Sequence, residues 1–234
     1  MKPSITCIDK SYEMLKEDAA ESDTGIQILL QECFNSSTKD FIAKLTDITS
    51  DAFGKPRPES DVKDHVVKVD RLYLAFDGKR SNNNLVGFSS YNYLRDVDGS
   101  NILYLCGIAV RKAYQKLGIF ELINRIEIAS CPFTPDFFVG RTQNPVIYEA
   151  MSKLVKKTYP SEQPIPFEIQ KLGRALAKRL NMKDFDTQNF VHKGTYNENM
   201  YDVIPPVRAK TLFDEALKLN YERGDSVLVV GTLQ

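Results

Sequence analysis

Three β-strand patterns separated by two turns lie between Val66 and Val110, and they constrain the fold more than any other part of the sequence. β-Branched and aromatic residues dominate the three segments, which are VVKVDRLYLAF (66–76), LVGFSSYNYL (85–94) and ILYLCGIAV (102–110). The intervening DGKRSNNN and DVDGSN are rich in Gly, Asn and Asp, the residues of tight turns. We therefore predict an antiparallel meander. Its third strand is almost entirely apolar, so we expect it to lie centrally with both faces covered.

Helical patterns flank this meander on both sides. Apolar residues recur at helical spacing over 40–53, namely Phe41, Ile42, Leu45, Ile48 and Phe53, and again over 121–129. A strand is predicted over 135–142, followed by a helix with Asn144 as N-cap and Pro145 in its first turn. Because a strand, a helix and a strand follow one another here, we expect the strands 102–110 and 135–142 to be parallel.

The two ends of the chain carry weaker patterns. We predict a short strand over 5–8, helices over 24–34, 167–180 and 210–219, and a closing strand over 226–233. The predicted fold class is α/β in its α+β form: a mixed, mostly antiparallel central sheet flanked by helices, with a helical C-terminal extension. We expect a single domain over residues 1–234. It would consist of an N-terminal extension (1–38), a core (39–159), and a helical extension with the closing strand (160–234).

Charge and composition argue against several classes of partner. Lys plus Arg and Asp plus Glu both number 31, so the chain lacks the basic excess typical of proteins that bind nucleic acid or anionic membranes. No stretch approaches the ~20 apolar residues of a membrane helix, and the N-terminus lacks a signal-peptide pattern, so we expect a cytoplasmic protein. The four cysteines and two histidines do not cluster, which predicts no metal site. A homodimer is compatible with the sequence.

The segment from Gly107 to Ile123 is the part of the sequence that says most about function. A buried strand ends at Val110, a polar loop follows, and a helix opens near Gly118. The first N–H groups of a helix have no partner within it and carry partial positive charge, so such a loop can bind phosphates through its backbone. The loop is neither a nucleotide P-loop, which ends in Gly-Lys-Ser/Thr, nor a dinucleotide fingerprint, which needs three glycines.

This segment resembles the coenzyme A signature of the GNAT acyltransferases, in which a strand ends in Val and a short loop leads to Gln/Arg-x-x-Gly-x-Gly/Ala. Val110, Gln115 and Gly118 occupy the matching positions, whereas Phe120 stands where Gly or Ala is usual. The resemblance extends over roughly residues 40–159. It implies a strand backbone that binds the pantetheine arm and loop amides that bind the pyrophosphate. It assigns the pantetheine to Ile108, Ala109 and Val110, and the pyrophosphate to the amides of Gln115, Lys116, Leu117, Gly118, Ile119 and Phe120.

The resemblance also implies a reaction, direct transfer of an acetyl group from acetyl-coenzyme A to an amine of a small molecule or peptide. It implies a coenzyme A contact at Asn144, for which a plain N-cap is an equal alternative, and makes Tyr148 a candidate general acid, for which a core aromatic is the alternative. The general base stays open, because the signature strand has no Glu. Water-relayed deprotonation or Glu149 would serve, and we interpret Cys106 as an inert thiol. The rival interpretation is a non-catalytic module on this fold, which binds coenzyme A or another protein.

Acceptor specificity in this family comes from the helices before the meander and from C-terminal additions. YNENMYDVIPP (196–206) is rich in Tyr, Asn and acidic residues. It would line a pocket for a cationic amine or form a packed surface loop.

Overall fold

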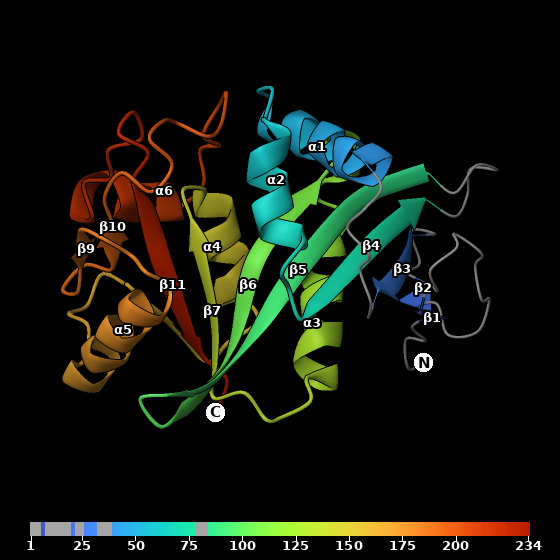
Figure 1. The fold of residues 1–234 in the computed structure, drawn as a ribbon. Helices are drawn as coiled ribbons and strands as arrows, with labels where there is room; N and C mark the ends of the chain where they lie inside the picture. The colour runs from blue at the N-terminus through green and yellow to red at the C-terminus, as the bar shows by residue number, and fades with distance from the viewer. Residues whose placement is uncertain (1–5, 8–19, 22–25, 32–38, 78–83) are drawn as a thin grey trace. The chain divides into compact units, whose positions relative to one another are not determined.

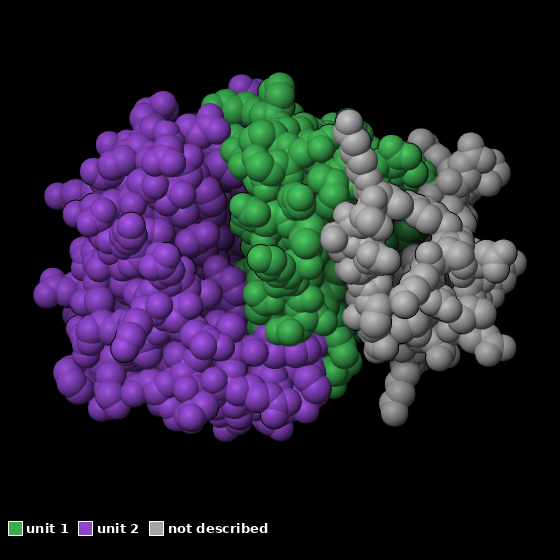
Figure 2. All heavy atoms as spheres, in the orientation of Figure 1, with its two compact units in different colours: residues 1–92, 105–130 green, residues 93–104, 131–234 purple. Residues whose placement is uncertain are grey.

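The computed structural model describes residues 6–7, 20–21, 26–31, 39–77 and 84–234 (Figure 1). The chain divides into two compact units, coloured separately in Figure 2. Unit 1 comprises Met1–Asn92 and Leu105–Ser130, and unit 2 comprises Tyr93–Tyr104 and Cys131–Gln234. Two long strands, β5 (Asn84–Val97) and β6 (Ser100–Val110), have residues in both units.

Unit 1 contains the N-terminal part of the sheet. Its strand order is β1-β3-β4-β5-β6, and β2 also pairs with β3. The added strands are β1 (Thr6–Cys7), β2 (Ala20–Glu21), β3 (Ile26–Gln31) and β4 (Arg71–Asp77). Pairing is antiparallel from β3 to β4 and from β4 to β5, and parallel between β1 and β3. The antiparallel β4–β5 pair confirms the first hairpin of the predicted meander, while most of its turn (78–83) lies outside the described residues.

Helices cover both faces of these strands in unit 1 (Figure 1). α1 (Lys39–Phe53) and α2 (Glu59–Val66) pack over one face. The core between them and the strands consists of Phe41, Ile42, Leu45, Ile48, Val62, Val66, Leu72, Leu74, Phe88 and Ala109. Four of the five apolar residues predicted on the first helix are in this cluster. Each such side chain contributes about 1.5–3 kcal/mol through burial, so the amphipathic pattern fixes which face of α1 turns inward.

The helix α3 (Ile119–Ser130) attaches to the other face through buried polar groups. Tyr73 donates a hydrogen bond to Glu127 (2.7 Å), and Tyr91 donates one to Asn124 (2.9 Å). Burial and then the charge of Glu127 raise the pKa of Tyr73 well above its ordinary value, so the phenol stays a donor. These bonds satisfy groups that would be costly to bury alone.

Unit 2 contains the C-terminal part of the sheet, in the order β6-β7-β11-β10-β9, with β8 also paired to β11. Its strands are β7 (Phe137–Thr142), β8 (Lys157–Tyr159), β9 (Phe185–Asp186), β10 (Val191–His192) and β11 (Ser226–Thr232). Its helices are α4 (Pro145–Ser152), α5 (Phe167–Arg179) and the short α6 (Ala209–Thr211). β11 is antiparallel to β7 and almost fully buried, which confirms the predicted closing strand.

The predicted fold class is confirmed: a mixed sheet, mostly antiparallel and flanked by helices. Several local predictions are wrong. The strand predicted from Val66 begins at Arg71, because residues 59–66 form α2, with Val62 and Val66 buried one turn apart. The helix predicted over 24–34 contains the strand β3, which is paired residue by residue with β4.

Two errors concern the C-terminal part of the chain. The helix predicted over 144–159 ends at Ser152, and Lys157–Tyr159 instead pairs with β11. The helix predicted over 210–219 is split into α6 and a π-helical turn, Leu212–Ala216. The two-residue strands β9 and β10 have no pattern long enough to be recognised in the sequence.

Candidate functional site

The burial of the strand β6 changes along its length. Ile102, Leu103, Tyr104 and Leu105 are buried, as a central strand requires. Beyond them Cys106, Gly107, Ile108 and Val110 are only half-buried, although three of the four are apolar or lack a side chain. The expected coverage of both faces therefore holds for the first half of the strand. Of the three residues to which the pantetheine arm was assigned, Ile108 and Val110 have accessible surface, whereas Ala109 is buried.

The loop after β6 has the backbone shape expected for an anion site. Lys112–Tyr114 form a 3₁₀ turn, and Lys116 and Gly118 adopt positive φ angles of 65° and 77°. The Gln115 amide donates to the Lys112 carbonyl at 3.3 Å. Within the part of the chain that the structure describes, the amides of residues 116–120 donate to no backbone carbonyl. Five of the six amides predicted to bind pyrophosphate are therefore available.

Four contacts hold this loop in place. The Gln115 side chain donates to the Val110 carbonyl at 3.0 Å, which joins the loop to the strand end. The other three use carboxylates from distant elements: Arg111 donates to Asp47 (2.5 Å), the Lys112 amide to Asp51 (2.7 Å) and Tyr114 to Asp77 (2.7 Å). Sequence reasoning missed these anchors, because the partners lie 37 to 64 residues apart along the chain.

The loop residues fit a bound diphosphate. A Cβ added to Gly118 would meet no atom within 4 Å, so the backbone can approach a ligand there. Leu117 is 43% exposed, and Gln115, Lys116 and Gly118 are also exposed. Phe120, the departure from the signature, is half-buried, and its carbonyl accepts a hydrogen bond from Asn124 at 2.7 Å. The Phe120 amide, like those of residues 116–119, donates to no backbone carbonyl among the described residues.

The two remaining predicted site residues lie on α4 in unit 2. Asn144 is the N-cap: its Oδ1 accepts from the Val146 amide at 2.9 Å, as the sequence predicts. Its own amide donates to the Thr142 hydroxyl at 2.9 Å. These bonds engage one oxygen and one amide of Asn144, and the predicted coenzyme A contact stays a prediction.

Tyr148 is 8% exposed, and its hydroxyl donates to the Pro160 carbonyl at 2.6 Å. Its ring packs edge-on against Phe213 with centroids 5.7 Å apart. Burial raises the pKa of Tyr148 to about 12, so the phenol is protonated at neutral pH, as a general acid must be. To protonate a thiolate it would first have to release Pro160. Glu149, a candidate base, accepts a hydrogen bond from the Ala209 amide at 2.8 Å.

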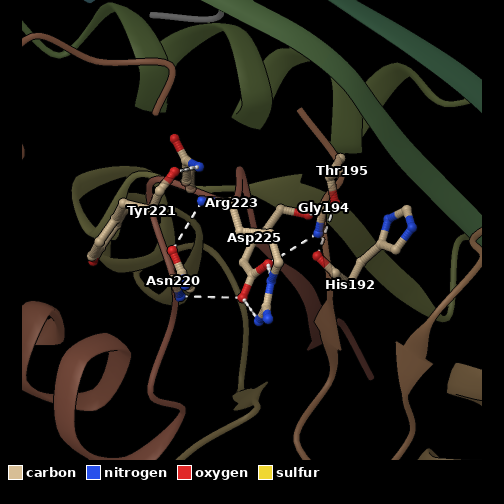
Figure 3. A network of polar contacts seen from close by, with 9 residues as sticks. His192, Gly194, Thr195, Asn220, Tyr221, Arg223 and Asp225 are labelled. Carbon is tan, nitrogen blue, oxygen red and sulfur yellow. Dashed lines mark hydrogen bonds and ion pairs between the residues drawn. The ribbon is translucent and has the colours of Figure 1, made fainter. Parts of the chain in front are cut away.

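The segment 196–206 forms a packed surface loop. Gln143, which is 1% exposed, donates to the Glu198 carbonyl and accepts from the Met200 amide at 2.8 Å. Beside the start of this loop, the buried Asp225 accepts from the Gly194 and Asn220 amides and from Arg223 (Figure 3). An open hollow of about 530 Å³ adjoins this network, lined by Asp184, Phe185, Asp186, Lys193, Gly194 and Arg223.

Neither a membrane span nor a metal cluster emerges from the described ranges. No helix there has the length and apolarity needed to cross a membrane. No group of three or more His, Cys, Asp or Glu side chains there is placed to hold a metal ion.

Comparison with known families identifies the signature segment. The model of the acetyltransferase (GNAT) family matches residues 42–127, a range that includes most of α1, then α2, β4–β6, the loop and most of α3. This segment is therefore similar to the GNAT acetyltransferases in sequence. The resemblance of the loop to the GNAT coenzyme A signature is thereby confirmed.

One solved structure supports the GNAT fold. A chain in the crystal structure of the NatC complex bound to Gag peptide and CoA is 12% identical, with a TM-score of 0.50 over 88% of this chain and 99% of that one. At such identity the likeness shows the fold alone. The crystal structure of Arabidopsis thaliana NAA60 in complex with a bisubstrate analogue is 16% identical, with a TM-score of 0.47 over 88% of this chain and 98% of that one. A search of curated proteins finds no match.

Proposed function

We propose that this chain is an N-acetyltransferase that moves an acetyl group directly from acetyl-coenzyme A to an amine. The observation that carries the proposal is the set of available amides at residues 116–120, at the start of α3 and directly after the half-buried end of β6. Backbone amides at a helix N-terminus bind diphosphates, and the edge of a strand binds an amide-bearing arm as an added strand would. The family match over residues 42–127 supports the same assignment.

In this proposal the cofactor residues keep the roles that the signature gives them. The amides of Gln115, Lys116, Leu117, Gly118, Ile119 and Phe120 hold the pyrophosphate, with the Gln115 amide shared with the Lys112 carbonyl. Ile108, Ala109 and Val110 align the pantetheine arm, and Asn144 adds a contact from α4. Tyr148 stays the candidate acid for the leaving thiolate. Acetyl-coenzyme A is consumed as a co-substrate and supplies the acetyl group and the thiol leaving group.

The acceptor is an amine of a small molecule or a peptide. The NatC structure contains a bound peptide, which supports the inclusion of peptides among the candidates. The segment 196–206 is anchored on Gln143, and a part for it in acceptor recognition stays a prediction. The balanced charge of the chain gives no general preference for acidic or basic acceptors.

Thiol release from acetyl-coenzyme A tests this function directly. The purified protein is incubated with a panel of polyamines, amino acids, aminoglycosides and peptides with free N-termini, and free coenzyme A is measured. We expect at least one amine to accelerate thiol release above the rate without amine. If acetyl-coenzyme A binds but no amine raises the rate, the non-catalytic coenzyme A-binding module becomes the better account. The replacement of Gly or Ala by Phe120 is the observation that favours that alternative.

A further inference from the structure

The helix α2 brings His65 into contact with Gly107 on the signature strand. A Cβ added to Gly107 would lie 3.2 Å from Cβ of His65 and 3.6 Å from its Cδ2. These distances are close to the limit for carbon contacts, so the absence of a side chain at Gly107 allows the imidazole to lie against the strand. His65 is half-buried, so part of the residue is accessible.

Hydrogen bonds fix the orientation of this imidazole. Nδ1 lies 2.5 Å from the Asp61 carbonyl oxygen, one helical turn earlier. A carbonyl can only accept, so Nδ1 carries the proton and Nε2 of the neutral ring has a free lone pair. Ser90 on β5 donates to the His65 carbonyl at 2.6 Å, which ties the end of α2 to the sheet. Among the described residues, no hydrogen bond to Nε2 is formed.

In the proposed binding mode, the thioester lies beside Gly107, the residue of β6 that His65 contacts. With the pyrophosphate on the amides of residues 115–120 and the pantetheine beside Val110 to Ile108, the sulfur end of the cofactor points toward Gly107. Side chains alternate along a strand. Gly107 and Ala109 therefore share the face covered by α1 and α2, where Ala109 belongs to the core cluster. Cys106 points to the other face, where it interacts electrostatically with Tyr91.

We propose that His65 is the general base of the transfer, with Nε2 accepting the proton of the attacking amine. This inference rests on the proposed function. The amine nitrogen forms a bond to the thioester carbonyl carbon, and its proton passes to Nε2. The carbon–sulfur bond then breaks, and the coenzyme A thiolate takes up one proton while the imidazole releases one. The products are an amide and a free thiol, and the imidazole is again neutral.

The first test observes the ring itself and needs no acceptor. The chain has only two histidines, so its imidazole NMR signals are few, and a His192→Gln variant assigns them. We expect His65 to show the Nδ1–H tautomer in the free protein. Its signals should move on addition of acetyl-coenzyme A, and less with coenzyme A, which lacks the acetyl group. Unmoved His65 signals in a sample that calorimetry shows to be saturated would overturn the assignment while leaving cofactor binding intact. Failure to bind acetyl-coenzyme A would overturn the proposed function and this inference together.

The second test measures turnover with whichever amine gives the fastest thiol release. His65→Gln should lower the rate about 10²- to 10⁴-fold, the usual contribution of a general base, at unchanged affinity for acetyl-coenzyme A. Lys63→Gln is the matched control, since Lys63 is exposed on the same helix, and it should retain the full rate. Full turnover of a folded His65→Gln protein would contradict the proposal.

Discussion

At Gly118 the backbone has a φ of +77°, and a side chain added there would meet no protein atom within 4 Å. The space is therefore available to a ligand. The same two features occur at Gly99, in the turn between β5 and β6, where φ is +78°. Gly99 thus provides a matched site at the opposite end of β6, with the same backbone strain and none of the proposed ligand contacts.

We expect Gly118→Glu to abolish detectable binding of acetyl-coenzyme A, because it places a carboxylate beside the pyrophosphate. Gly99→Glu should leave the affinity unchanged, although both variants lose about 1–2 kcal/mol of stability from the left-handed backbone. Calorimetric titration of both folded proteins checks this. Equal affinities in the two variants would remove the loop from the binding site.

A second residue-scale prediction concerns Tyr148, whose hydroxyl has a buried partner. Tyr148→Phe leaves the Pro160 carbonyl without its donor, so we expect a loss of about 1–3 kcal/mol in the free energy of unfolding, measured by urea denaturation. If Tyr148 is also the general acid, turnover falls at unchanged affinity for acetyl-coenzyme A. Full turnover of the variant would assign the hydroxyl to packing alone.

The carboxylate of the buried Asp225 accepts hydrogen bonds from two segments of unit 2, at Gly194 and at Asn220. Burial alone would raise its pKa, but the hydrogen bonds from Arg223 and from the Gly194 and Asn220 amides outweigh burial and hold the pKa below its usual value. A depressed folded-state pKa stabilises the protein above the unfolded value of about 4, and the contribution is lost as pH falls through the folded value.

We therefore expect Asp225→Asn to lower the free energy of unfolding by about 1–3 kcal/mol at pH 7, since the amide of Asn cannot accept all of these bonds. The difference between variant and wild type should shrink as the pH falls below about 4. Urea unfolding at pH 7 and at pH 3 measures both values. A difference that is the same at the two pH values would show that the charge of Asp225 is unimportant.

At the scale of elements, the packing of α5 depends on Gly173. A Cβ added there would lie 2.5 Å from two ring atoms of Phe190, which is fully buried and whose ring centroid lies 5.6 Å from that of Phe185. Alanine favours a helix by about 1 kcal/mol over glycine, while overpacking a core costs about 1–3 kcal/mol. Because Phe190 is fully buried, we expect overpacking to dominate.

Gly173→Ala should therefore destabilise the protein, and a Phe190→Leu background should reduce or reverse that effect, since leucine leaves room for the added methyl group. A double-mutant cycle in urea measures this coupling. Additive effects of the two substitutions would contradict the account of this contact.

The elements also show what the sequence could predict. β5, β6, α3, β7, α5 and β11 were predicted from long uniform patterns, and the signature loop from its spacing of Gln115 and Gly118. α2 was missed, because its valines extend into a strand-like run and its helical form depends on packing Val62 and Val66 against α1 and the sheet. His65 was missed with it. His65 and Gly107 are 42 positions apart in the sequence, so no local pattern predicts their contact.

At the scale of the whole molecule, the family match covers residues 42–127 and includes the loop but not α4, β7 or the C-terminal part of the chain. The prediction of a single domain over residues 1–234 stays a prediction, as does the place of Asn144 and Tyr148 in the site. Binding of the cofactor is the property on which the remaining assignments depend.

Calorimetric titration of the wild-type protein with acetyl-coenzyme A tests this property most directly. The account predicts binding at micromolar concentration with one site per chain. An absence of heat and of thermal stabilisation at millimolar ligand would contradict it, because a ligand that binds the folded state must raise the melting temperature.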